Sequence, residues 1–212
     1  MMQCPLCGAP DAEFFHRDAQ REYLRCGACR LVYVPPRYFL DLEAERAEYQ
    51  LHENDPADAG YREFLSRLAT PLLARLAPGS RGLDFGCGPG PALVAMLKEA
   101  GHDVARYDPF FFPDRTPLSR RYDFITATEV VEHLHRPGEE LERLWALLRP
   151  GGWLAIMTKL VIDAQAFANW HYKNDLTHVS FFSTDTWHWW GDCQQSPPEF
   201  LGNDVILLRR AR

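Results

Sequence analysis

A short apolar run that ends in glycines, residues 82–90 (GLDFGCGPG), constrains the fold of this chain more than any other segment. Glycine has no Cβ and adopts positive φ, so a strand that ends in glycines lets a ligand approach the backbone closely. Asp108 ends the next apolar run, and a carboxylate at the end of a neighbouring strand suits a ribose diol. Together these features predict a nucleoside-binding crevice at the carboxyl ends of parallel strands.

From residue 80 onward, apolar runs of strand length alternate with segments of helical pattern. The expected strands are residues 82–86, 103–107, 122–128, 153–158 and 205–209, and the expected helices are residues 91–101 and 138–148. Such alternation predicts an α/β fold with a Rossmann-like, doubly wound, mostly parallel sheet. The interval 108–122 is too short for a helix and a strand, so we expect a shortened sheet in which one βα unit is reduced to a loop.

A helical region is expected between the first residues and this sheet. Asp55 is a suitable helix cap and Pro56 suits the first turn, and apolar residues recur after them at steps of three and four. Pro71 should kink this helix or divide it in two. The chain thus divides into a small N-terminal unit at 1–37, a helical linker at 38–79, and the main domain at 80–212.

The N-terminal unit contains four cysteines in two closely spaced pairs, Cys4 with Cys7 and Cys26 with Cys29. Their spacing is typical of four-thiolate zinc sites, because two intervening residues let one tight turn present both sulfurs to a single ion. The alternatives are two disulfides or buried thiols without a ligand. We expect a zinc ribbon whose ion supplies much of the stability of residues 1–37, and whose role is structural.

Composition excludes several classes of protein. The chain has 212 residues, of which 46% are hydrophobic and 25% charged, so it can bury a sizeable core. The net charge of −6 makes nucleic acid an unlikely partner and argues against anionic membranes. No apolar run approaches the roughly 20 residues that span a bilayer, and the N-terminus does not resemble a signal peptide, so a cytoplasmic location is expected.

Four motifs follow one another in the order and approximate spacing of a known family. They are residues 84–90 (DFGCGPG), 108–109 (DP), 122–133 (YDFITATEVVEH) and 148–154 (LRPGGWL). Over about residues 58–212 the chain resembles class I S-adenosylmethionine-dependent methyltransferases, and the ribbon resembles an N-terminal zinc-binding module of some bacterial members. A dinucleotide is a weaker alternative, because the sixth position counted from Gly86 is Pro91 rather than glycine.

This resemblance implies S-adenosylmethionine as cofactor and assigns its contacts. The methionine part would be lined by Gly86, Cys87, Gly88 and Gly90. Asp108 would hold the ribose hydroxyls, and Thr128, Glu129 and Val130 would pass beneath the sulfonium. Asp84 would order the loop or reach the amino group of the cofactor. A simpler alternative for the acids at 129 and 132 is that they start a helix, where negative charge is favourable.

A second cluster of polar and aromatic residues, 169–182 (NWHYKNDLTHVSFF), follows the expected strand 153–158. Its position predicts that it faces the site of the methyl acceptor. His171, Tyr172 and His178 are the candidate catalytic residues, since a histidine accepts a proton near neutral pH and a tyrosine hydroxyl orients an acceptor. Two alternatives remain open: a loop held together by its own side chains, or a metal site made by the two histidines with Asp175.

The functional hypothesis is methyl transfer to an oxygen, nitrogen or carbon atom of a small molecule. An RNA methyltransferase that uses the ribbon as a clamp is one alternative, and a non-catalytic protein that binds the cofactor or a partner is another. A strongly basic groove would favour RNA. A closed aromatic pocket beside the histidines would favour a small acceptor, and the absence of a cavity next to the cofactor would favour the non-catalytic alternative.

Overall fold

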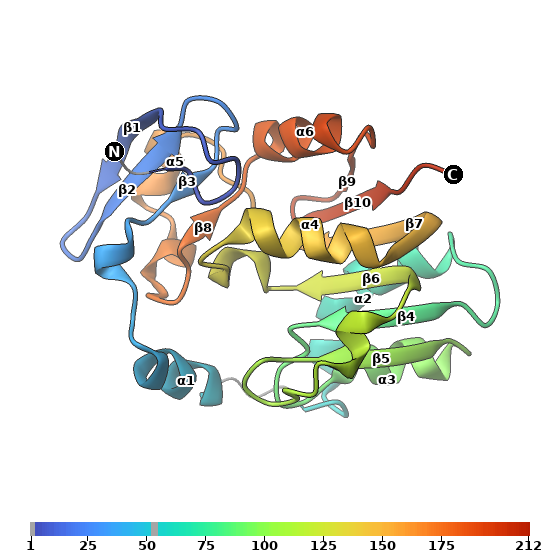
Figure 1. Ribbon diagram of the computed structural model, residues 1–212. Helices are drawn as coiled ribbons and strands as arrows, with labels where there is room; N and C mark the ends of the chain where they lie inside the picture. The colour runs from blue at the N-terminus through green and yellow to red at the C-terminus, as the bar shows by residue number, and fades with distance from the viewer. Residues whose placement is uncertain (1–2, 52–54) are drawn as a thin grey trace.

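The computed structural model describes residues 3–51 and 55–212, and its centre is a six-stranded sheet (Figure 1). In spatial order β5, β4, β6, β7, β10, β9, its strands are β5 (Asp103–Tyr107), β4 (Arg81–Phe85), β6 (Tyr122–Thr128), β7 (Leu148–Met157), β10 (Val205–Arg209) and β9 (Glu199–Leu201). Strands β5, β4, β6 and β7 are parallel, whereas β10 runs antiparallel to both β7 and β9. The predicted mostly parallel, Rossmann-like sheet is confirmed.

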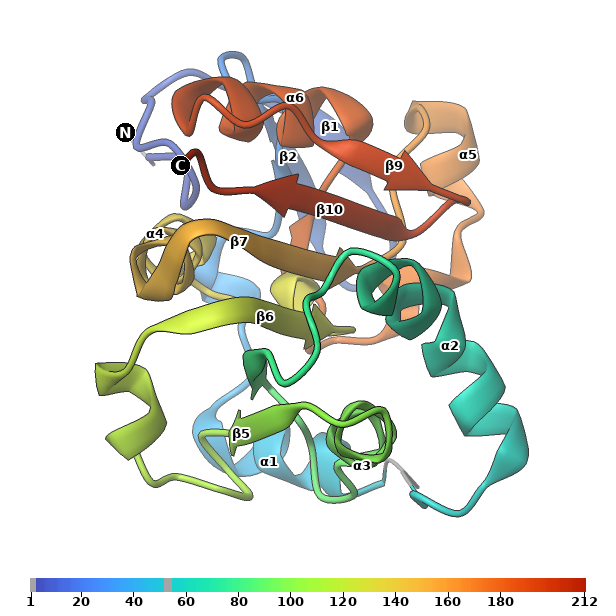
Figure 2. The same cartoon turned by 90° about the vertical axis from the view of Figure 1, so that its right-hand side faces the viewer.

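Helices cover both faces of this sheet (Figures 1 and 2). The helices are α2 (Ala59–Leu73) and α3 (Ala92–Glu99) on one face, and α4 (Pro137–Leu147) and α6 (Thr184–Cys193) on the other. Successive residues of a strand point to opposite faces. Phe124 of β6 therefore packs in the core with α2 and α3, while Ile125 packs in the core with α4 and α6.

The segment between β5 and β6 contains a single turn of 3-10 helix, η2 (Thr116–Ser119), in place of a full crossover helix and strand. The predicted reduction of one βα unit to a loop is therefore confirmed. Short helices also occur in the other connections: η1 (Pro36–Tyr38), η3 (Val131–His133), α5 (Ala164–Ala168) and η4 (His171–Asn174). None of the helices in the described part of the chain has the length and apolarity needed to cross a membrane.

The linker contains two helices, α1 (Leu42–Gln50) and α2, and the start of α2 differs from the prediction. Asp58 is the N-cap, its side chain accepting a hydrogen bond from the Tyr61 N–H at 2.5 Å. Asp55 instead closes the preceding turn by accepting from the Ala57 N–H. Pro71 does not divide the helix, because it lies two residues before its end, where a missing N–H affects only the last turn.

The N-terminal unit forms a second, antiparallel sheet from β1 (Ala12–Arg17), β2 (Glu22–Cys26) and β3 (Val32–Tyr33). A strand from the far end of the chain, β8 (Ser180–Phe181), pairs with β3 and completes it. Figure 1 shows this strand reaching the ribbon from the main domain. The predicted boundary at residue 37 separated β8 from the sheet to which it belongs, since a two-residue strand has no sequence signal of its own.

The buried side chain of Arg21 ties the ribbon to the segment that leads into β8. Its guanidinium donates to the backbone carbonyls of Lys173 (2.6 Å), Asp175 (2.8 Å) and Leu176 (3.0 Å). It also donates to the Tyr23 hydroxyl at 2.9 Å. The Arg21 side chain is thus built into the interface, and it fixes the backbone of the candidate catalytic segment.

A second contact joins the ribbon to the start of α4. The N–H of Gly138 donates to the carbonyl of Pro5 at 3.2 Å. A Cβ on Gly138 would lie 2.3 Å from the Leu6 carbonyl oxygen, so any larger residue would push the two units apart. The ribbon is therefore packed against the main domain at two separate places.

We expect Arg21→Ala to lower the free energy of unfolding by about 2–4 kcal/mol, because several part-buried acceptors lose a charged donor. The control is Arg25→Ala, which removes an exposed ion pair with Glu13 and should cost less than about 1 kcal/mol. Urea unfolding followed by circular dichroism measures both. Equal, small losses in the two variants would show that Arg21 does not hold the segment.

Candidate functional site

A cavity of about 800 Å³ opens at the carboxyl ends of β4, β5 and β6. Its lining includes eight of the nine predicted cofactor residues: Asp84, Gly86, Cys87, Gly88, Asp108, Thr128, Glu129 and Val130. The ninth, Gly90, is not part of the lining; its carbonyl accepts a hydrogen bond from the Ala92 N–H at the start of α3. The fold therefore brings together residues that lie up to 46 positions apart, from Asp84 to Val130.

The glycine loop after β4 takes a conformation that side chains would prevent. Gly86 has φ of +73°, and a Cβ there would lie 2.5 Å from a methyl group of Val130. Gly88 also has positive φ, +63°. Such a loop turns back tightly on itself and leaves its backbone accessible from the cavity.

Asp108 connects this loop to the next one. Its Oδ2 accepts from the Gly88 N–H at 3.0 Å, and its Oδ1 accepts from the N–H groups of Phe110 and Phe111 at 2.9 and 3.0 Å. A carboxylate has about four acceptor positions, so three are already engaged. The predicted ribose contact would add to these bonds or replace one of them. The structure thus gives Asp108 an additional role in ordering both loops.

Asp84 lies behind the glycine loop and is almost completely buried, with 4% of its surface exposed. The Thr126 hydroxyl donates to its Oδ1 at 2.6 Å. Burial raises the pKa of Asp84 to about 7, and the nearby carboxylate of Asp108 raises it further. In the absence of a cationic ligand, Asp84 is therefore partly protonated near neutral pH.

Two polar atoms at the end of β6 lack partners among the described residues. They are the hydroxyl of Thr128 and Oε1 of Glu129, and both are buried. Glu129 has φ of +53°, in the left-handed region that a residue with a side chain rarely adopts. Unsatisfied polar atoms and backbone strain in a cavity wall are typical of ligand-binding sites.

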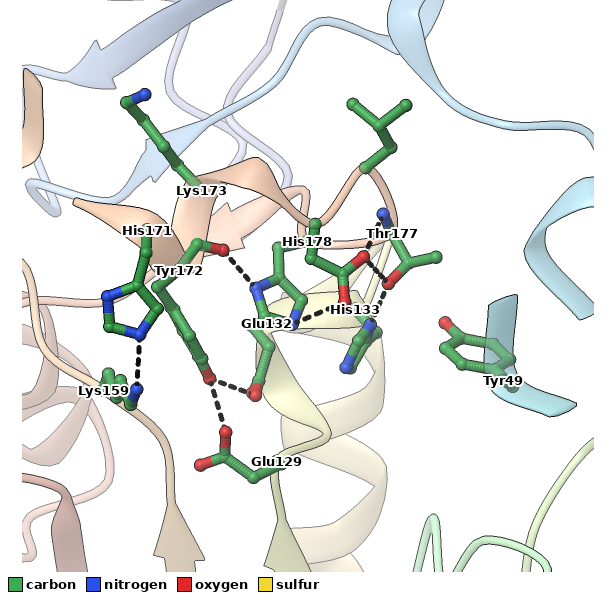
Figure 3. A network of polar contacts seen from close by, with 12 residues as sticks. Tyr49, Glu129, Glu132, His133, Lys159, His171, Tyr172, Lys173, Thr177 and His178 are labelled. Carbon is green, nitrogen blue, oxygen red and sulfur yellow. Dashed lines mark hydrogen bonds and ion pairs between the residues drawn. The ribbon is translucent and has the colours of Figure 1, made fainter. Parts of the chain in front are cut away.

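Glu129 and Glu132 share the hydroxyl of Tyr172, which hydrogen-bonds to a carboxylate oxygen of each (Figure 3). The other Glu132 oxygen accepts from the Thr158 hydroxyl at 3.0 Å. Burial raises the pKa of Glu129 to about 7 and that of Glu132 to about 8, and repulsion by Glu129 contributes to the second shift. The Tyr172 hydroxyl therefore points into this buried network, and Tyr172 is not among the residues that line the cavity.

His133 and His178 lie side by side, with ring centroids 4.5 Å apart. Nδ1 of His178 donates to the Tyr172 carbonyl at 2.7 Å. The Thr177 hydroxyl donates to Asp175 at 2.6 Å, so it accepts the bond from Nδ1 of His133 at 2.9 Å. Both imidazoles, when neutral, thus carry their proton on Nδ1 and their lone pair on Nε2.

His178 lines the cavity, and His171 does not. His171 lies on the exposed side of η4, where its Nε2 is 3.1 Å from the Lys159 Nζ (Figure 3). Of the three predicted catalytic residues, the structure therefore brings Tyr172 and His178 together, with ring centroids 4.2 Å apart, and leaves His171 outside the cavity. Adjacent residues of a short helix point in different directions, which the sequence pattern of residues 169–182 did not reveal.

Helix α1 supplies wall residues that the sequence did not indicate. The Tyr49 ring packs against Phe110 and His133, at centroid distances of 5.1 and 5.2 Å. A carboxylate oxygen of Glu45 lies 3.8 Å from Nε2 of His135, and both residues line the cavity. In the sequence, this role is indicated only by a predominantly polar helical segment, residues 42–50, with an aromatic residue, Tyr49, near its end.

The four ribbon cysteines form a compact cluster whose sulfur atoms all lie within 4.8 Å of one another. The Sγ atoms of Cys4 and Cys29 are 3.5 Å apart, as are those of Cys7 and Cys26. A disulfide bond is about 2.05 Å long, whereas sulfurs around a tetrahedral zinc ion are about 3.8 Å apart. The arrangement fits one ion with four thiolate ligands better than it fits two disulfides.

The raised pKa of Asp84 predicts how stability depends on pH. The folded protein holds this proton more tightly than the unfolded chain, in which the ordinary pKa is 3.8, so the contribution of Asp84 to stability falls as pH rises from about 4 to 7. The difference of about three pKa units corresponds to about 4 kcal/mol at full ionisation. We expect Asp84→Asn to remove this loss, because the amide oxygen still accepts from Thr126.

The matched control for this experiment is Asp103→Asn, at an exposed position on the neighbouring strand. Urea unfolding of the ligand-free proteins between pH 4.5 and 8 provides the comparison. The Asp84 variant should gain stability relative to the parent as pH rises, and the control should follow the parent. A parallel course for the parent and the Asp84 variant would refute a shifted carboxyl group at this position.

Comparison with known proteins places the chain in a family. Residues 58–193 match the family model described as a methyltransferase domain. A tRNA U34 carboxymethyltransferase of Idiomarina loihiensis is 29% identical over 109 residues, which is 39% of this chain and 34% of that protein. The chain thus matches about a third of the length of this curated relative.

Solved structures show the same fold. A Burkholderia thailandensis 1,6-didemethyltoxoflavin-N1-methyltransferase, solved with 1,6-didemethyltoxoflavin and S-adenosylhomocysteine, has a TM-score of 0.57 at 20% identity, covering 95% of this chain and 100% of that one. A chain of the complex between the Haloferax volcanii Trm112 methyltransferase activator and a methyltransferase also has a TM-score of 0.57, at 14% identity, covering 79% and 98%. The protein therefore belongs to the methyltransferase domain family and has the fold of class I S-adenosylmethionine-dependent methyltransferases.

Proposed function

We propose that the protein transfers the methyl group of S-adenosylmethionine to a small-molecule acceptor. The observation that supports this most directly is a single cavity with two chemically different ends. One end has the glycine loop and Asp108, and the other has His133, His178 and Asp175. A volume of about 800 Å³ lies toward the upper end of the range for ligand sites, which suits a cofactor and a small acceptor together.

The cofactor end fits S-adenosylmethionine by its chemistry. The tight glycine loop leaves room where side chains would collide, and Thr128 and Glu129 offer buried polar atoms to the ligand. Carboxylates at Asp84, Asp108 and Glu129 suit a cofactor that carries a positive sulfonium and an amino group. S-adenosylmethionine has no phosphate group, so this site does not need cationic residues to bind one. When bound, the cofactor supplies an activated methyl group.

The acceptor end supports a small molecule over RNA. Beyond the residues assigned to the cofactor, the cavity is lined by charged residues of mixed sign: Glu45, Arg136, Glu139, Glu140, Arg143 and Asp175. An RNA site would concentrate positive charge, because phosphate contacts dominate RNA binding. Aromatic rings of Tyr49 and Phe110 form part of the wall, which suits a planar or apolar acceptor body.

Among the predicted catalytic residues, His178 is the one that the geometry favours. It lines the cavity, and its hydrogen bond to the Tyr172 carbonyl fixes the orientation of a ring that can act as a base or a ligand. Tyr172 orients the carboxylates of Glu129 and Glu132 rather than the acceptor. His171 takes no part in this proposal.

Calorimetry with S-adenosylmethionine and S-adenosylhomocysteine tests the cofactor site. We expect both ligands to bind, and Asp108→Ala to weaken binding at least tenfold, because both loops lose their common acceptor. The control is Asp114→Ala, at an exposed position of the same connection where the carboxylate accepts hydrogen bonds from Thr116. Failure of both ligands to bind the parent protein would refute the proposed cofactor.

The acceptor class is tested with cofactor that carries a labelled methyl group. Label should enter small molecules of a deproteinised cell extract, and His178→Ala should lower this transfer. Transfer into tRNA alone would instead favour the RNA alternative, which the curated relative also suggests by its name.

We also propose that the four ribbon cysteines bind one structural zinc ion. Metal analysis should find about one zinc per chain, and Cys4→Ser combined with Cys7→Ser should remove it and lower the melting temperature. Cys193→Ser, at an exposed cysteine outside the ribbon, is the control and should leave the zinc content unchanged. An equal zinc content in all three proteins would contradict this assignment.

A further inference from the structure

A second group of metal-ligating side chains lies at the acceptor end of the cavity. It consists of Glu132 and His133, at the turn after β6, and His178, on the segment that follows η4. One carboxylate oxygen and one nitrogen of each ring lie within 4.8 Å of one another. Figure 3 shows the three side chains converging from these two segments. This set differs from the two histidines and Asp175 that the sequence suggested as a metal site.

The hydrogen bonds of the two histidines prepare them as ligands. A metal-bound imidazole usually donates its other N–H to a carbonyl, carboxylate or similar acceptor, which fixes the ring and its tautomer. His178 donates Nδ1–H to the Tyr172 carbonyl, and His133 donates Nδ1–H to the Thr177 hydroxyl. Thr177 is in turn held by Asp175. Both rings are thereby oriented with Nε2 as the coordinating atom.

The side chain of the third member, Glu132, is also held in place by hydrogen bonds. Its side chain is completely buried, and its two oxygens accept from the hydroxyls of Tyr172 and Thr158. Carboxylate ligands of metals are commonly held by such outer hydrogen bonds. Glu129 and Asp175 add two more carboxylates to the same region: Glu129 through the Tyr172 hydroxyl, and Asp175 at 3.6 Å from Nε2 of His178. A cation bound among these carboxyl groups would stabilise their ionised forms.

We propose that Glu132, His133 and His178 bind one divalent transition-metal ion whose remaining coordination positions face the cavity. Two imidazoles and one carboxylate leave positions open for water or a substrate, as in catalytic rather than structural sites. His133 and His178 line the same cavity as Gly86 and Asp108, so the ion lies at the acceptor end of the proposed active site.

This inference rests on the proposed methyl transfer and narrows its acceptor to a hydroxyl compound. The ion holds the acceptor oxygen and lowers the pKa of its hydroxyl group. The hydroxyl proton passes to water, a bond forms between the oxygen and the methyl carbon, and the carbon–sulfur bond breaks with its electron pair going to sulfur. The site thus assigns oxygen, rather than nitrogen or carbon, as the methylated atom.

Mn²⁺ is the probe, because thiolates do not favour it and the ribbon cysteines will not compete for it. The full chain is freed of loosely bound metal with a chelator and titrated with Mn²⁺, and free ion is followed by electron paramagnetic resonance. We expect one bound Mn²⁺ per chain in the parent protein. His133→Ala and His178→Ala should each weaken binding at least tenfold.

The control variant is His171→Ala, which removes a histidine of the same segment whose side chain lies outside the cavity; it should bind Mn²⁺ like the parent. Glu132→Gln keeps the side-chain volume and should also weaken binding. Thermal melting of each variant establishes that it is folded. Among the three ligand variants, His133→Ala should disturb folding least, because His133 is only partly buried whereas Glu132 and His178 are buried.

Absence of Mn²⁺ binding in the parent, or unchanged binding in folded His133→Ala, would overturn the metal site. Binding of S-adenosylhomocysteine is measured on the same samples to separate the two proposals. If S-adenosylhomocysteine binds and Mn²⁺ does not, the metal site is refuted and the methyltransferase proposal stands. If Mn²⁺ binds and the ligand does not, the metal site is supported and the proposed methyl transfer is refuted.

Discussion

The geometry of the acceptor end depends on one buried guanidinium. Arg21 lies in the ribbon, yet three of its hydrogen bonds go to backbone carbonyls of Lys173, Asp175 and Leu176. Between these residues and β8 lie Thr177 and His178, so the ribbon helps to fix the backbone that carries the imidazole. The charged donor offsets its own desolvation only while all of these carbonyls are in place, which makes the contact cooperative. The ribbon thus supports a wall of the cavity.

The sequence predicted the sheet and the cofactor end well, because both depend on local signals. Apolar runs of strand length, the glycines at 86 and 88 and the carboxylate at 108 each require a particular backbone conformation where they occur. The acceptor end was predicted poorly. His171 and His178 look equivalent in the sequence, but a turn of 3-10 helix points the first toward Lys159 and away from the cavity. Tertiary contacts that decide such directions, including those of Tyr49, leave no local pattern.

The two ends of the cavity are coupled through β6 and the turn that follows it. Thr128, Glu129 and His133 line the cavity, and the buried Glu132 lies next to His133 in the turn after β6. Tyr172 joins the two acids through one hydroxyl. A change in the position of Glu129 on ligand binding would therefore be transmitted to Glu132 across a single hydrogen-bonded group.

Strand β8 belongs by sequence to the main domain and by pairing to the ribbon sheet. The two units therefore cannot be exchanged like independent modules. Removing residues 1–37 would leave the backbone of Ser180 and Phe181 with an open edge, which invites pairing with another chain. The same excision would uncover apolar side chains such as Phe167, which now pack on the ribbon. Even the outer strand β1 takes part in this packing, because its Phe15 ring lies 5.2 Å from that of Phe167, so in the described part of the chain only the solvent-facing turns of the ribbon are free of the main domain.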